Sequence, residues 1–297
     1  MSGKRKRIRI KTDTKKHVRI RKCIHSILVF KLYIYRKVEE MIFETHGHYD
    51  DTQFDEDREQ LIEEFLRKDI DKVMNVGADM QSSRNSVELA EKYPHFYAAV
   101  GVHPSEVGEL TEADIQELKS MVQDNPKVRA IGEIGLDYHF DDDPPRDVQK
   151  KWFLRQLELA QELAMPVIIH SRDAASDTME ILKRMDGGRN GGVIHCYSYS
   201  VEQAREYIKM GFNIGVGGVV TFKNSRKLQE VVEDIPLERI VLETDSPYMA
   251  PVPFRGKRNS ALNIPYIAEK IAEIKGVSVQ KVYETTYANA LDMYRIQ

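Results

Sequence analysis

Cysteine and long apolar runs are scarce in this chain, and each scarcity excludes a class of protein. Two cysteines among 297 residues cannot form the disulfide framework of a small secreted domain. No apolar run approaches the roughly 20 residues that span a bilayer. The glycine-rich dinucleotide loop G-x-G-x-x-G is absent after the first apolar run that follows Met41. We therefore expect a cytoplasmic protein with no membrane partner, and a monomer.

Basic residues are concentrated at the N-terminus. Residues 1–40 contain 14 Lys and Arg against three acidic residues, a net charge of +11, whereas the remainder carries −14. An acidic body is not typical of a non-specific duplex-DNA binder. Residues 1–40 fit three interpretations: a basic arm for nucleic acid or a membrane surface, a targeting peptide, or an extension outside the fold. We favour the extension, because Lys31 interrupts the apolar piece of this segment and the regular pattern begins only at Met41.

From Met41 onward, short apolar runs alternate with amphipathic segments. This pattern predicts eight strand–helix pairs, and hence a single (β/α)₈ TIM barrel over residues 41–297. The runs are apolar throughout, as expected for parallel strands buried on both faces. A doubly wound open sheet is the alternative, and the missing glycine-rich loop disfavours it. The predicted strands are residues 41–43, 72–76, 96–102, 128–131, 167–169, 192–194, 212–220 and 240–242.

The predicted helices follow from amphipathic spacing and from N-cap residues such as Thr111. They are residues 55–68, 82–93, 112–123, 146–163, 174–185, 201–210, 225–233, 264–274 and 278–287.

Six side chains that can bind a metal follow five of the apolar runs. A barrel places its active site at the C-terminal ends of its strands, so these groups are expected at one rim. Burying six such groups unpaired would be costly, which favours a metal site over isolated structural residues. Imidazole mixed with carboxylate suits Zn²⁺, Mn²⁺ or Fe²⁺, and oxygen ligands alone suit Mg²⁺. The six residues are His46, His48, Glu133, His170, His195 and Asp245.

Six ligands are enough for two ions if one carboxylate bridges them, an arrangement common in phosphate-ester hydrolysis. Asp245 then has two possible roles, as a metal ligand or as the acceptor of a proton from the attacking water. Arg172 follows His170 and is expected either to support the metal ligands from behind or to orient the substrate. His103 ends the third strand, where it is either a phosphate contact or a structural group before Pro104.

The loops after strands seven and eight contain arginines, lysines and an aromatic residue each. Barrel phosphate sites are frequently built from these two loops. The first loop contributes Lys223 and the second contributes Arg258 and Asn259. We expect these residues to hold phosphates, beside an aromatic ring that stacks a base. The alternative is a solvated loop whose charges serve solubility.

Several strings of this chain resemble the TatD family of metal-dependent deoxyribonucleases, within the amidohydrolase-like barrels. They are ETHGHYD, GVHP, IGEIGLDY, PVIIHSRDA, VIHCYS, GGVVTFKNS, LETDSPYMAP and GKRN, in order from Met41 to the C-terminus. The resemblance implies a divalent-metal hydrolase acting on DNA, often as a 3′→5′ exonuclease on single strands. It says nothing about residues 1–40.

The resemblance also implies a division of the ligands between two ions, which we expect to be Mg²⁺, Mn²⁺ or Zn²⁺. His46, His48, Glu133 and Asp245 would hold one ion, and Glu133, His170 and His195 would hold the other. Glu133 and Asp245 would then be the catalytic carboxylates, with Glu133 bridging the ions and Asp245 near the attacking water.

Three positions depart from the pattern of the family. Glu44 stands where the family usually has Asp, Tyr199 replaces a glycine, and Ala261 replaces a common proline. Because Tyr199 is expected to line or narrow the substrate channel, substrate preference is the property in question. Hydrolysis of carboxylic esters or amides, including aminoacyl esters of tRNA, is the alternative activity. A non-catalytic nucleic-acid-binding protein is a third possibility, which the complete ligand set disfavours.

Overall fold

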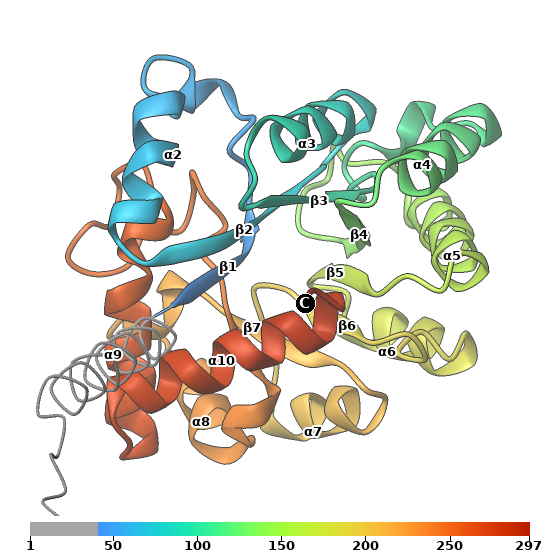
Figure 1. Ribbon diagram of the computed structural model, residues 1–297. Coiled ribbons are helices and arrows are strands. Elements are labelled where there is room, and N and C mark those ends of the chain that lie inside the picture. Colours follow the sequence, from blue (N-terminus) through green and yellow to red (C-terminus); the bar gives the residue numbers. More distant parts are fainter. Residues whose placement is uncertain (1–40) are drawn as a thin grey trace, which may run out of the picture. The chain divides into compact units, whose positions relative to one another are not determined.

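The apolar runs of the sequence form a ring of parallel strands in the computed structural model, which describes residues 41–297 (Figure 1). The strands are hydrogen-bonded in chain order from β1 to β8. A bridge between Gly47 and Ser246 brings the last strand back to the first. The predicted TIM barrel is therefore confirmed. The strands are β1 (Ile42–Gly47), β2 (Ile70–Val76), β3 (Phe96–Val100), β4 (Val128–Asp137), β5 (Val167–Arg172), β6 (Gly192–Ile194), β7 (Asn213–Val216) and β8 (Ile240–Leu242).

Helices surround this ring, and four of the α-helices start at a residue whose side chain accepts a hydrogen bond from a free backbone amide. Thr111 and Asp114 form a reciprocal capping box at the start of α4. Gly276, with φ of 65°, ends α9 in the left-handed conformation that glycine favours. The α-helices are α2 (Arg58–Arg67), α3 (Met80–Lys92), α4 (Glu112–Asp124), α5 (Arg146–Glu162), α6 (Ala175–Arg184), α7 (Val201–Lys209), α8 (Arg226–Asp234), α9 (Ile264–Lys275) and α10 (Val279–Tyr294). The 3₁₀-helices are η1 (Thr52–Phe54), η2 (Val107–Glu109), η3 (Gly218–Thr221), η4 (Leu237–Arg239) and η5 (Ala261–Asn263).

Alternate strand residues belong to two separate hydrophobic cores. Ile42 and Val73 pack in the larger core with the surrounding helices. Phe43 and Met74 belong to a smaller core inside the barrel. Both faces of the strands are therefore buried, which explains why the runs are apolar throughout rather than alternating with polar residues.

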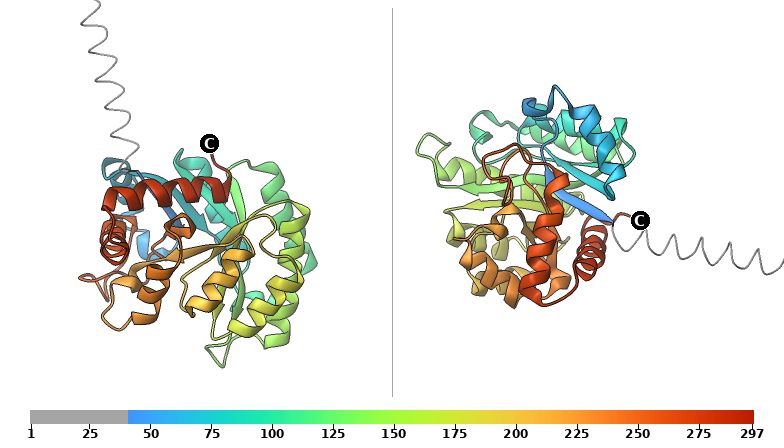
Figure 2. Two further views of the ribbon diagram at one scale, coloured as in Figure 1. Left: turned by 90° about the horizontal axis from the view of Figure 1, so that it is seen from below. Right: turned by 90° about the vertical axis from the view of Figure 1, so that its left-hand side faces the viewer.

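Helix α10 closes the N-terminal end of the barrel (Figures 1 and 2). Met293 and Tyr294 belong to the same buried core as the interior residue Phe43. Asn289 donates to the carbonyl oxygens of Leu237 and Ile240, at the start of β8. The opposite end of the barrel, where the strands terminate, is left for the functional side chains.

Several strands differ in their bounds from the prediction. β1 and β5 continue past their apolar runs and include His46 and His170. β4 continues to Asp137, so Glu133 lies within the strand rather than at its end. The run at 212–220 was predicted as one strand, but β7 ends at Val216 and η3 begins at Gly218, with Gly217 between them. Runs of apolar residues do not mark where a strand stops when the next element is also buried.

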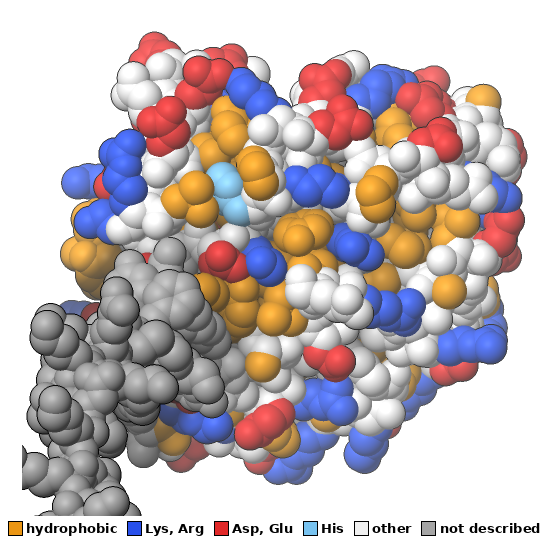
Figure 3. Space-filling model, viewed as in Figure 1, with side chains coloured by type: hydrophobic (Ala, Val, Ile, Leu, Met, Phe, Trp, Pro, Cys, Tyr) orange, Lys and Arg blue, Asp and Glu red, His pale blue; other side chains and the backbone are white. Residues whose placement is uncertain are grey.

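The surface of the described body is mixed in charge. Figure 3 shows basic and acidic side chains interspersed over the face viewed, with no continuous patch of one sign. No helix of residues 41–297 is long and apolar enough to cross a membrane. The predicted extension at residues 1–40 lies outside the described residues. Residues 41–297 fall within one compact unit.

Candidate metal centre

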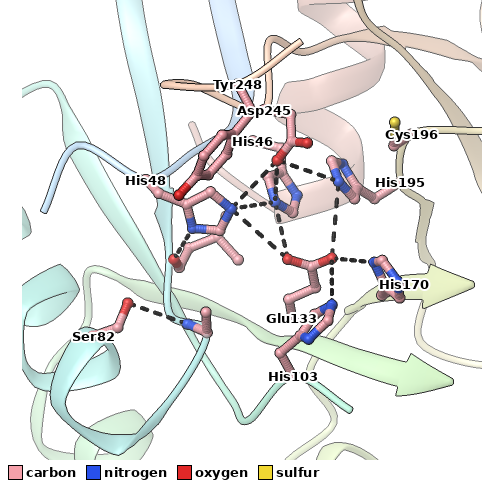
Figure 4. Close-up of polar contacts among 12 residues, drawn as sticks. His46, His48, Ser82, His103, Glu133, His170, His195, Cys196, Asp245 and Tyr248 are labelled. Atoms are coloured by element: carbon pink, nitrogen blue, oxygen red, sulfur yellow. Dashed lines mark hydrogen bonds and ion pairs between the residues drawn. The ribbon is translucent and has the colours of Figure 1, made fainter. Parts of the chain in front are cut away.

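The six predicted ligands meet at the C-terminal end of the barrel (Figure 4). Glu133 lies between two groups of imidazoles. Its Oε2 atom is 3.3 Å from His46 Nε2 and 3.8 Å from His48 Nε2. Its Oε1 atom is 2.8 Å from His170 Nδ1 and 3.8 Å from His195 Nε2. Each carboxylate oxygen therefore faces a separate pair of histidines.

Asp245 joins this cluster from the segment that follows β8. Its Oδ1 atom is 3.5 Å from His48 Nε2, 3.7 Å from His195 Nε2 and 3.9 Å from His46 Nε2. Its side chain is 22% exposed, whereas that of Glu133 is 5% exposed. Asp245 is thus the carboxylate of the pair that is more open to solvent. Its φ of 60° aims the side chain away from the direction that a continued strand would give it.

Two carboxylates and one backbone carbonyl behind three of the imidazoles fix the orientation of these rings. Asp137 Oδ2 is 2.9 Å from His170 Nε2, and Glu243 Oε2 is 3.0 Å from His195 Nδ1. The carbonyl oxygen of Val76 is 2.8 Å from His48 Nδ1. Such outer partners orient metal-binding histidines and raise their basicity.

His46 differs from the other three histidines. Its ring is fully buried and stacks on that of His195, with centroids 3.4 Å apart. Its Nδ1 atom is buried and has no hydrogen-bond partner among the described residues. Its Nε2 atom is 3.2 Å from His48 Nε2. Two imidazole nitrogens that face one another beside two carboxylates suit a shared cation, because a metal accepts both lone pairs.

The electrostatics of the cluster also fit a cation. Burial by itself would raise the pKa of Glu133, but His46 and His195 hold that pKa well below its usual value. Burial would lower the pKa of His195, yet Glu243 and Glu133 raise it to about 10. The pKa of His170 rises to about 9, because Asp137 and Glu133 outweigh burial. The carboxylates therefore attract positive charge, which protons or divalent cations can supply.

Glu44 and Glu243 are important buried residues to which the sequence assigned no role. Glu44 accepts hydrogen bonds from the backbone N–H groups of His46 and Thr244 and from the Thr244 hydroxyl, so it ties β1 to the segment after β8. Burial raises its pKa to about 8. Glu243 also accepts from the backbone N–H of Cys196 at 2.7 Å. Both glutamates directly follow an apolar run of the sequence, and this position was the signal that could have identified them.

Gly215 makes room for Glu243. A Cβ atom at Gly215 would lie 2.3 Å from Glu243 Oε2. The glycine that interrupts the seventh apolar run thus permits close packing of the carboxylate that holds His195.

A cavity of about 740 Å³ opens in front of the cluster. Its lining includes five of the six predicted ligands, and His46 lies behind them. His103 and Arg172, two predicted substrate contacts, also line it. His103 Nε2 is 4.0 Å from Glu133 Oε1, and burial beside His170 lowers the pKa of His103 to about 3. Arg172 is exposed, with its guanidinium 5.1 Å from the Phe140 ring centroid.

The other predicted substrate contacts lie outside this cavity. Lys223 is exposed on the loop between η3 and α8. Arg258 forms a two-bond ion pair with Asp57 and lines a second cavity. Asn259 is fully buried, and its side chain bonds Thr244 O and Asn263 Nδ2 within the protein. Its amide therefore supports the loop instead of facing a substrate.

Tyr199 does not line the channel as expected. Its hydroxyl lies 2.9 Å from Ser171 Oγ and accepts a hydrogen bond from the Ala174 N–H, near the start of α6. Tyr197 and Ser198 line the cavity instead. The large side chain is accommodated because it points toward the β5–α6 junction.

A strand-end cluster of four imidazoles and two carboxylates on a TIM barrel defines the class of metal-dependent hydrolases with an amidohydrolase-like fold. The family model for the TatD-related DNases matches residues 43–295. The chain therefore belongs to the TatD family of metal-dependent hydrolases.

Relatives and solved structures agree with this assignment. The chain is 43% identical to the uncharacterized metal-dependent hydrolase YabD of Bacillus subtilis, over 86% of this chain and all of that protein. It is 32% identical to the 3′-5′ ssDNA/RNA exonuclease TatD of a Rahnella strain, over 86% of this chain and 98% of that one. The crystal structure of the Escherichia coli TatD homologue YjjV covers 87% of this chain, with a TM-score of 0.82 and 30% identity.

Proposed function

We propose that this chain is a two-cation phosphodiesterase that shortens single-stranded DNA, or RNA, from its 3′ end. The observation that carries the proposal is the position of Glu133, whose two oxygens face separate pairs of histidines. A carboxylate in this position suits a bridge between two ions. Family membership and the exonuclease relative support nucleic acid as the substrate.

Divalent cations bound here would polarise the phosphodiester and lower the pKa of the attacking water. His46, His48 and Asp245 would hold one of them and His170 and His195 the other, with Glu133 shared.

Asp245 is the group best placed to take the proton from the attacking water. It lines the cavity, and His48 and His195 overcome the effect of burial to lower its pKa. It is therefore an ionised carboxylate at the mouth of the cluster. Glu133, whose side chain is nearly enclosed, would hold the cations between the two pairs of histidines. His103 is neutral at pH 7, so it would donate a hydrogen bond to the substrate rather than a positive charge.

One experiment tests this function directly. The protein is loaded with Mg²⁺, Mn²⁺ or Zn²⁺ and incubated with single-stranded DNA and RNA labelled at either end. We expect stepwise release of nucleotides from the 3′ end. Asp245→Asn should lower kcat by about 10² to 10⁴, the usual contribution of a positioned base. Glu133→Gln should abolish turnover. The exposed Glu238→Gln serves as the matched control. Unchanged cleavage by either site variant would refute the assignment.

Hydrolysis of a carboxylic ester, including an aminoacyl ester of tRNA, is the second candidate. Asp50, Asp51 and Asp79 line the cavity, and Arg172 is the only Lys or Arg in its described lining. An acidic wall favours an ammonium group over a phosphate. These carboxylates already accept hydrogen bonds from Asn75, Tyr248 and Ser82 respectively, so phosphodiester hydrolysis remains our first proposal. Turnover of aminoacyl esters without cleavage of DNA or RNA would reverse this order.

A further inference from the structure

A second cavity of about 450 Å³ adjoins the metal cavity, and the two share Tyr248 and Met249. Arg255, Lys257 and Arg258, from the loop between β8 and η5, line the second cavity. We propose that this cavity is a subsite for the phosphate backbone of a single strand whose terminal bond lies at the metal centre. The inference rests on the proposed nucleic-acid substrate and names where the chain beyond the cleaved bond is held.

The cations of the second cavity differ in how they are neutralised. Arg258 is paired with Asp57, and its guanidinium lies 4.8 Å from the Phe54 ring centroid. Arg255 lies 4.1 Å from the centroid of the Phe222 ring, and Lys257 lies 5.9 Å from that of Phe254. Within residues 41–297, neither Arg255 nor Lys257 forms an ion pair with a carboxylate. Two positive charges are therefore available to an anion in this concavity.

The metal cavity provides the opposite environment. Five carboxylates line it, against the single guanidinium of Arg172. Bound cations would compensate for the two carboxylates of the cluster, but not for Asp50, Asp51 and Asp79, which form an acidic wall of the cavity. A polyanion held at the metals is repelled along that wall. The second cavity is the neighbouring region whose basic side chains include two without an ion pair. The single-stranded nucleic acid should therefore leave the metal centre in that direction.

Tyr248 supplies a surface between the two cavities. Its side chain is 51% exposed, and its hydroxyl donates to Asp51 Oδ2 at 3.0 Å, which restrains the ring. Figure 4 shows Tyr248 beside His48 and Asp245. An exposed and restrained aromatic ring next to cations is the arrangement on which unpaired bases stack. We therefore assign to Tyr248 the base of a nucleotide that lies between the two cavities.

The test compares a long substrate with a short one. The double variant Arg255→Ala/Lys257→Ala is loaded with Mn²⁺, and kcat/KM is measured on a single-stranded DNA decanucleotide and on a dinucleotide that fills only the metal cavity. We expect the ratio of the two values to fall about tenfold or more. Loss of two phosphate contacts should also reduce the salt dependence of decanucleotide binding by about 1.4 in the log–log slope. Arg67→Ala, which removes an exposed charge on α2, should change neither quantity.

Tyr248 offers an internal comparison. Tyr248→Phe keeps the ring and should retain decanucleotide binding better than Tyr248→Ala, because stacking needs the ring and not the hydroxyl. If the double variant loses kcat/KM equally on the decanucleotide and the dinucleotide, so that the ratio of the two values is unchanged, the subsite is refuted.

Failure of the subsite is distinguishable from failure of the proposed function. If the wild-type protein cleaves neither DNA nor RNA, the phosphodiesterase proposal fails. Binding of a fluorescent decanucleotide to the metal-loaded protein then still tests the subsite. Weaker binding in the double variant, with a shallower salt slope than in Arg67→Ala, would support it. Identical binding would refute it.

Discussion

At the scale of residues, single hydrogen-bond partners decide whether the histidines at the C-terminal end of the barrel point toward a common site. Glu243 and Asp137 hold His195 and His170 from behind, and the Val76 carbonyl holds His48. A metal ligand that is already oriented loses less freedom when an ion binds. The outer residues are therefore expected to matter for affinity although they contact no ion.

Glu243→Gln tests this idea. The substitution keeps the size of the side chain but removes the charge that faces His195 Nδ1. We expect the affinity for the ion that His170 and His195 would hold to fall about 10- to 100-fold, measured by calorimetric titration of the metal-free protein. Glu238→Gln, an exposed substitution of the same kind, should leave the affinity unchanged. An unaltered affinity in Glu243→Gln would show that Glu243 serves only packing.

Gly215 offers a second test at the residue scale. In Gly215→Ala the new methyl group meets Glu243 Oε2 at 2.3 Å, so the carboxylate must shift. Such overpacking costs about 1–3 kcal/mol of unfolding free energy. Gly217→Ala is the matched control, because its nearest neighbour would be an ordinary 3.4 Å away. Urea unfolding of both variants compares them, and equal stabilities would contradict the steric argument.

At the scale of elements, α10 connects the N-terminal end of the barrel to β1, the strand that carries His46. The hydroxyl of Tyr294 donates to the Thr45 carbonyl at 2.9 Å, and both residues are buried. The ring of Tyr294 packs 5.7 Å from that of Phe43. A C-terminal helix thus supports β1 at Thr45, one residue before the first candidate ligand.

Tyr294→Phe should remove this hydrogen bond and leave the ring contacts in place. The Thr45 carbonyl would then be buried without that partner, at a cost of about 1–3 kcal/mol in unfolding free energy. Thermal or urea unfolding measures the loss. Tyr266→Phe, on the partly exposed Tyr266 of α9, should change stability by less than about 0.5 kcal/mol. Similar stabilities for the two variants would argue against a supporting role for the hydroxyl.

At the scale of the whole molecule, the barrel gathers charged groups that are unfavourable together without a counterion. Glu133, Glu243 and His195 are all buried at the rim. Because a cation binds this site only when the barrel is folded, metal and fold should stabilise one another.

Removal of metal should therefore lower the Tm of the wild-type protein. Metal at 100 times its Kd adds about 2.7 kcal/mol of stability, and a chelator should reverse this gain. Differential scanning calorimetry with and without chelator measures the shift. In Glu133→Gln, which lacks the shared carboxylate, the shift should be much smaller. A wild-type Tm that is independent of metal would contradict the metal centre itself.

The sequence by itself determined the repeated pattern of strands and helices and the six candidate ligands. Apolar runs, capping residues such as Thr111 and candidate ligands near the ends of these runs are local signals, and they predicted the barrel and the end at which these side chains gather. Boundaries were less well determined, because β4 continues through a buried segment that contains Glu133.

Only the tertiary structure decided how distant residues pair. It placed Glu243 behind His195, directed Tyr199 toward the β5–α6 junction and buried Asn259 away from the cavity. These outcomes depend on contacts between segments far apart in the chain. The residues adjacent in the sequence do not determine which way such a side chain points. The ring of strands brings such segments within hydrogen-bond distance, and packing at its rim then selects one orientation for each side chain.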